Sequence, residues 1–144
     1  MTAFNHHPFM PDAALSLKQP WATLLVHGHK SVEVRNWPTA RRGRILIHAA
    51  RVSDPREKAW AHVPPELKEA ANQLGGLIGA AELTDCVSYR SVEDFVAARH
   101  LHLNEPEWFK PPVLYGFVFA NAEVLPFQPL SGWMRFFPVH DEEK

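Results

Sequence analysis

Four segments of the chain have the residue pattern of β-strands, and they are separated by connections of very different length. In the first, Val32 and Val34 alternate with polar residues, which is the period of a strand with one apolar face. The others are short apolar or alternating runs bounded by glycine, proline or polar residues. The four predicted strands cover residues 31–37, 44–50, 77–84 and 113–124.

The segments before and between these strands carry helix signals, apart from the short turn that joins the first two strands. Helices are predicted over residues 20–28, over 54–74 and over 91–99. Pro64 and Pro65 interrupt the middle segment, which we therefore expect to form two helices. Strands joined by helices of unequal length favour an α+β fold with a small mixed or antiparallel sheet, and they leave open whether that sheet closes into a barrel.

A chain of 144 residues with 46% hydrophobic content has material for one well-buried core. We expect a flexible lead-in over residues 1–13 and a single domain over 14–140. No apolar run approaches the ~20 residues needed to cross a bilayer, and the N-terminus lacks a secretory signal, so no membrane contact and a cytoplasmic location are expected.

Cys86 is the only cysteine. No cofactor is expected, and no metal either, since the pairs His27/His29 and His100/His102 lack nearby cysteine or patterned carboxylates.

Positive charge is concentrated in one part of the sequence. Residues 14–51 contain seven lysines and arginines and one glutamate, a balance of +6 within a chain whose formal charge is -1. The remaining segments therefore sum to -7. This asymmetry indicates a local anionic ligand, with phosphate as the leading candidate. A long duplex would be repelled over much of the surface, so a short single strand or one nucleotide fits better.

The sharpest group of candidate binding residues is Lys30, Glu33 and Arg35. Arginine offers a planar fork for phosphate or guanine, lysine a compact charge, and glutamate an acceptor for an exocyclic amine. The competing interpretation is an exposed strand with a surface salt bridge, which contributes under ~1 kcal/mol.

Residues on either side extend this candidate surface. Trp21, Trp37 and Trp133 are candidates for base stacking, with core packing as the alternative. Arg42 and Arg44 flank a turn and are candidates for phosphate contacts, although a solvated turn would look the same. The remaining candidates are Lys18 and Gln19 before the first helix, and His48, which strand alternation places on the polar face of residues 44–50.

The same residues carry a resemblance to a known family. The segments Leu15-Ser-Leu-Lys-Gln-Pro-Trp-Ala22, Gly28-x-Lys30-x-x-Glu33-x-Arg35 and Arg42-Gly-Arg-Ile-Leu-Ile-His-Ala49 resemble successive motifs of the ASCH domain, a branch of the PUA-like superfamily. The resemblance implies a small β-barrel ringed by short helices, with Lys30, Glu33 and Arg35 facing a ligand cleft. It also implies binding of RNA or DNA.

Some bacterial relatives in this superfamily are amidohydrolases acting on acetylated cytidine, and nuclease activity has been associated with others. Their catalytic lysine is followed three residues later by a threonine nucleophile, at the positions of Lys30 and Glu33. Glutamate cannot replace that nucleophile without changing the chemistry.

Three functional hypotheses follow. The first is a module that binds RNA, single-stranded nucleic acid or a nucleotide. The second is a hydrolase of a modified nucleoside or of RNA, in which Lys30 and Glu33 form an acid/base pair. The third is a protein-interaction domain with an exposed apolar patch at Trp133, Phe136 and Phe137.

Overall fold

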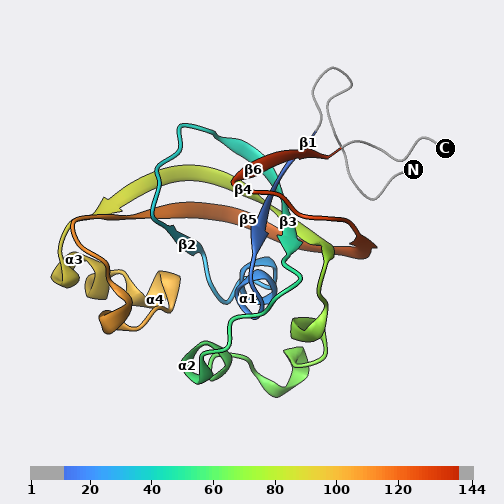
Figure 1. Cartoon of the computed structure of the whole chain (residues 1–144), viewed down its shortest axis with the longest axis horizontal. Coiled ribbons are helices and arrows are strands. Elements are labelled where there is room, and N and C mark those ends of the chain that lie inside the picture. The colour runs from blue at the N-terminus through green and yellow to red at the C-terminus, as the bar shows by residue number, and fades with distance from the viewer. Residues whose placement is uncertain (1–11, 140–144) are drawn as a thin grey trace.

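One mixed β-sheet of six strands runs through the computed structural model, which describes residues 12–139 (Figure 1). The strand order is β2-β5-β4-β3-β1-β6. β1 and β3 are parallel, and the other neighbours are antiparallel. The strands are β1 (Asp12–Leu17), β2 (Val32–Arg35), β3 (Gly43–Ala49), β4 (Gly76–Tyr89), β5 (Leu114–Pro129) and β6 (Phe136–Val139).

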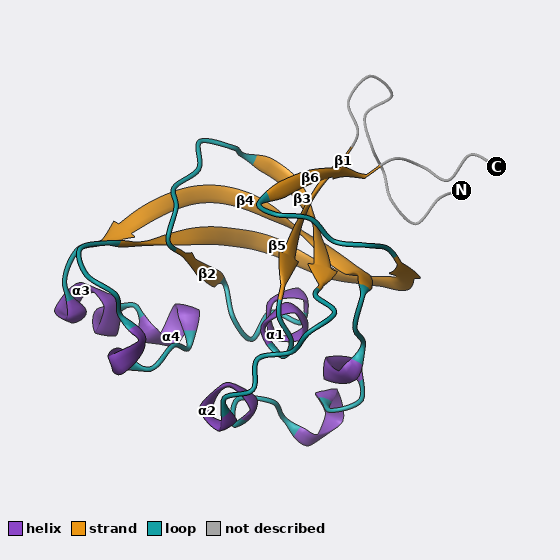
Figure 2. Ribbon diagram, in the orientation of Figure 1, coloured by secondary structure: helices purple, strands orange, loops and turns teal. Residues whose placement is uncertain are grey.

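The helices are short and lie along one side of the sheet (Figure 2). Ser91 caps α3, because its Oγ accepts a hydrogen bond of 3.1 Å from the Asp94 N–H. The helices are α1 (Trp21–Val26), α2 (Glu57–Trp60), α3 (Val92–Ala97) and α4 (Arg99–His102), with 3-10 turns η1 (Pro65–Leu67), η2 (Ala70–Asn72) and η3 (Pro106–Trp108). The predicted α+β class is thus confirmed.

The sheet is curved but not closed. β4 and β5 arch over the helices (Figure 1), while β2 and β6 form the two edges and do not pair with each other. The predicted barrel is therefore open at this seam, a geometry compatible with a PUA-like fold.

Several element boundaries differ from those expected. The segment 54–74 contains one short helix and two 3-10 turns instead of two helices, because its prolines limit each piece to about one turn. β4 and β5 are longer than predicted, at 14 and 16 residues. β1 and β6 were not predicted as strands. β6 contains Pro138, which removes a backbone donor and suits an edge strand.

Two apolar layers cover the faces of the sheet. The larger one packs α1 against the inward residues of the strands, with Leu25, Ile47 and Phe117 fully buried. Burial of each such side chain contributes ~1.5–3 kcal/mol. The smaller layer joins Leu46 to residues of β1, β4 and β6 on the opposite face. The predicted polar face of β3 is therefore wrong at His48, which is only 2% exposed.

None of the helices between residues 12 and 139 combines the length and apolar character required to cross a bilayer.

Candidate functional site

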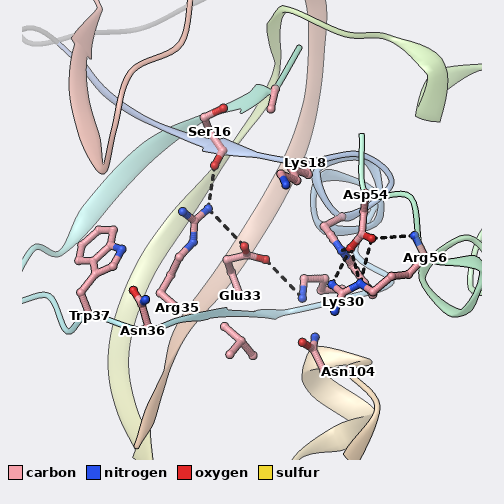
Figure 3. Close-up of a pocket in the computed structure, with 13 residues that line it drawn as sticks. Ser16, Lys18, Lys30, Glu33, Arg35, Asn36, Trp37, Asp54, Arg56 and Asn104 are labelled. Carbon is pink, nitrogen blue, oxygen red and sulfur yellow. Dashed lines mark hydrogen bonds and ion pairs between the residues drawn. The ribbon is translucent and has the colours of Figure 1, made fainter. Parts of the chain in front are cut away.

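A cavity of about 470 Å³ opens where β1 and β2 approach the start of α1 and the loop after β3. Figure 3 shows the side chains that surround it. Six of its lining residues are charged. The four cations are Lys18, Lys30, Arg35 and Arg56, and the two anions are Glu33 and Asp54. The net charge of the cavity lining is therefore +2.

The carboxylate of Glu33 lies between two cations. Its Oε1 is 3.4 Å from Lys30 Nζ, and its Oε2 is 3.2 Å from the guanidinium of Arg35. Alternation along β2 places Glu33 and Arg35 on the same face of the strand, which is why the two side chains meet. The structure thus brings together the three residues that the sequence singled out.

Lys30 is enclosed by protein, with 1% of its side chain exposed. Its Nζ donates a hydrogen bond of 2.9 Å to the carbonyl oxygen of His102 and lies 4.7 Å from the ring centroid of Trp21. Burial lowers the pKa of Lys30 below its ordinary range, and Glu33 opposes this effect. The lysine therefore acts on the cavity chiefly by orienting Glu33.

Arg35 reaches across the cavity to the first strand. One of its terminal nitrogens donates to the backbone oxygen of Ser16 at 2.7 Å, and 20% of its side chain remains exposed. Because Ser16 and Glu33 together fix the guanidinium, Arg35 presents a positioned charge to the cavity rather than a mobile one.

A second ionic group lies on the opposite wall and was not identified from the sequence. Asp54 accepts a hydrogen bond of 2.8 Å from Trp21 Nε1, and Arg56 donates to both of its carboxylate oxygens. Burial alone would raise the pKa of Asp54, but the hydrogen bonds from Arg56 and Trp21 outweigh it and lower the pKa to about 2. The sequence signal Asp54-Pro55 indicated only a helix start.

Two of the candidate stacking residues, Trp21 and Trp37, lie in the cavity wall but make structural contacts as well. Trp21 is 6% exposed. The ring of Trp37 packs edge-on against Phe117 and Phe136, with centroid distances of 5.0 and 5.6 Å. The guanidinium carbon of Arg135 lies 4.6 Å from the centroid of Trp37.

Four predicted site residues lie outside this cavity. Gln19 is fully buried and bonds to the backbone of Thr23 and Gln73. Arg42 pairs with Asp85 at 3.7 Å, and Arg44 pairs with Glu123 at 2.8 Å, both towards the opposite end of β3. His48 bonds to Ser16 and to the carbonyl of Leu130 beside a second cavity.

The predicted apolar patch is present only in part. Trp133 is 76% exposed, but Phe137 is 6% exposed and belongs to the smaller apolar layer, and Phe136 is half-buried. The prediction is therefore wrong for Phe137, because β6 pairs with β1 and turns that ring inward. Between residues 12 and 139, no group of three or more His, Cys, Asp or Glu side chains is arranged to hold a metal ion.

The family model of the ASCH domain matches residues 15–130, which includes every strand from β2 to β5 and the cavity described above. The chain belongs to the ASCH domain family. This ASCH domain is 36% identical over 88 residues to human activating signal cointegrator 1 and 35% identical to its mouse counterpart. Each match covers 56% of this chain and 15% of the relative, so the chain corresponds to a small part of those proteins.

Solved structures show the same fold. The crystal structure of ASCH from Zymomonas mobilis has a TM-score of 0.63 and 18% identity, covering 90% of this chain and 88% of the other. A mutant of that protein has a TM-score of 0.64 and 17% identity, with 90% and 91% covered. This ASCH domain therefore shares its architecture with the bacterial protein.

Proposed function

We propose that this ASCH domain binds RNA, a short single strand or a nucleotide in the cavity around Lys30, Glu33 and Arg35. The observation that carries the proposal is the Glu33 carboxylate held between two cations in a cavity of net positive charge. Membership of the ASCH family, whose members are linked to nucleic acids, supports it.

The side chains divide into two chemical roles. Arg35 and the exposed Lys18 bind phosphate, because both present positive charge to the cavity. Glu33 accepts a hydrogen bond from the exocyclic amine of a base, since Lys30 and Arg35 fix its orientation and 11% of its side chain is exposed. Trp37 supplies an aromatic edge of the wall.

The ligand is short and mostly single-stranded. The -7 balance outside residues 14–51 would repel a long phosphate backbone. Arg42 and Arg44 pair with carboxylates, so each offers less net charge to a polyanion than an unpaired arginine. We place this activity in the cytoplasm.

A hydrolase is the second candidate, and one observation favours it. Burial lowers the pKa of Lys30, which would increase the fraction of neutral amine able to accept a proton. Paired with Glu33 at 3.4 Å, that amine would serve acid/base chemistry on a modified nucleoside or on RNA. Turnover that survives in both Lys30→Ala and Glu33→Gln would eliminate this alternative.

The test is a titration of the protein with a fluorescent single-stranded RNA at several salt concentrations, followed by an analysis of the RNA for cleavage. Wild-type binding weakens as salt rises, with a slope of about -0.7 in log-log form for each phosphate neutralised. Arg35→Gln weakens binding and reduces that slope, while the matched control Arg44→Gln leaves both unchanged. Wild-type protein that binds no RNA, or binds with no salt dependence, contradicts the proposal. Cleaved RNA that depends on Lys30 favours the hydrolase.

A further inference from the structure

A second cavity, of about 550 Å³, adjoins the first. Ser16 and Ala50 line both cavities, and both residues are partly exposed. They lie at the carboxyl ends of β1 and β3, which run parallel with Ser16 opposite His48. A ligand that crosses these strand ends therefore meets both cavities.

The connection between β5 and β6, drawn in red in Figure 1, lines the second cavity and ends beside a residue in the wall of the first. Leu130, Ser131, Gly132, Trp133 and Met134 line the second cavity. The next residue, Arg135, places its guanidinium carbon 4.6 Å from the ring of Trp37 in the wall of the first.

This connection is held firmly at its start. His48 Nε2 lies 2.6 Å from the carbonyl oxygen of Leu130, and the Leu130 N–H donates to Gly75 at 3.0 Å. A Cβ atom on Gly132 would lie 2.6 Å from His48 Cε1, so only glycine allows this close approach. Trp133 follows directly, so the constrained glycine fixes where its backbone leaves the wall of the second cavity.

The chemistry of the second cavity suits a nucleobase. The indole of Trp133 is 76% exposed at its rim, an unusual position for the largest apolar side chain. Arg51, also exposed at the rim, supplies a positive charge for a phosphate. Burial lowers the pKa of His48, so its imidazole in the wall of the second cavity is uncharged at neutral pH. The volume lies within the ~300–1,000 Å³ range of small-molecule sites.

We propose that the second cavity is a subsite for an adjacent nucleotide, with Trp133 stacking on its base and Arg51 contacting its phosphate. This inference rests on the proposed function of the first cavity. It deepens that function, because it makes the ligand at least two nucleotides long and single-stranded across Ser16 and Ala50.

The experiment compares the affinities of adenosine 5′-monophosphate and of the 5′-phosphorylated dinucleotide pApA by titration calorimetry. For wild-type protein, the second nucleotide tightens binding by roughly 10-fold, the usual gain from stacking one base. Trp133→Ala removes most of this gain and leaves the affinity for the mononucleotide unchanged, and Arg51→Ala reduces the gain by a smaller factor.

The controls replace exposed side chains of the same chemical class. Val124→Ala removes an apolar side chain that is 53% exposed, and Arg90→Ala removes an exposed arginine; neither residue lines either cavity. Both control variants retain the tighter binding of pApA relative to adenosine 5′-monophosphate. The inference alone is overturned if the mononucleotide binds but pApA gains nothing, or if Trp133→Ala keeps the full gain, as it would if Trp133 served a protein partner. If neither compound nor a longer RNA binds wild-type protein, the proposed function itself fails.

Discussion

Lys30 Nζ lies 3.4 Å from Glu33 Oε1, and the lysine is almost fully buried while the glutamate keeps one edge at the cavity. The Lys30–Glu33 pair therefore contributes both to the stability of the folded domain and to the charge that the cavity presents to a ligand. A buried ammonium is tolerated because the carboxylate, the carbonyl of His102 and the ring of Trp21 surround it.

Replacing Glu33 with glutamine tests this coupling. Glu33→Gln leaves a buried lysine without its counter-charge, so we expect the free energy of unfolding to fall by roughly 3 kcal/mol. The pKa of Lys30 falls further, because Glu33 is what raises it. Urea unfolding measures the first effect. The more exposed pair Arg44–Glu123 is the control, and Glu123→Gln costs under about 1 kcal/mol. Equal losses in the two variants would show that burial of Lys30 does not matter.

The sequence predicted the ionic triad of the cavity but not its opposite wall. Lys30, Glu33 and Arg35 were recognisable because strand alternation places neighbours on one face within a short segment. Asp54 bonds to Trp21 from 33 positions away and the guanidinium of Arg56 lies over the ring of Trp108, and no local pattern encodes either approach. The curvature of the sheet and the path of the loop after β3 bring them together.

The same limit explains the errors at the edges of the fold. β1 pairs with β3 and β6, so its backbone partners lie far away in the sequence. The residue pattern of β3 suggested a polar face, but on that face Leu46 and His48 pack beside Phe137 of β6. His48 is buried there through its bonds to Ser16 and Leu130.

The low pKa of Asp54 provides a second prediction. Because donors from Arg56 and Trp21 stabilise the ionised carboxylate, removing either one raises the pKa above about 2. Arg56→Ala raises it more than Trp21→Phe, since Arg56 supplies the larger share of the hydrogen bonding. Carboxyl carbon NMR during an acid titration measures each pKa. A larger increase in Trp21→Phe would reverse the order of the two contributions.

His102 makes the domain sensitive to acid. Burial lowers the pKa of its imidazole to about 4, and its Nδ1 accepts a hydrogen bond of 2.9 Å from the Asn104 N–H, which protonation would break. The unfolded chain takes up this proton near the ordinary value of 6.5 and the folded chain only near 4, so the unfolded state binds more protons in between. Stability therefore decreases as the pH falls through this window.

Urea unfolding between pH 7 and pH 4.5 measures this loss, and an NMR titration of the His102 ring assigns it. Lowered pKa values of His27, His48 and His62 act in the same direction. A His102 ring that titrates near 6.5 in the folded protein would rule out this explanation. Because the carbonyl of His102 accepts from Lys30, we also expect acid to weaken ligand binding before the domain unfolds.

Ligand binding in the first cavity is tested most directly by a map of backbone amide shifts by NMR as a short single-stranded RNA is added. We expect the changes to concentrate at residues 16–18, 30–37 and 54–56, with smaller changes at 130–135, and Arg35→Gln to suppress the changes in the first three ranges. Changes centred on Arg42, Arg44 and the far ends of β4 and β5, or no changes at millimolar RNA, would contradict it.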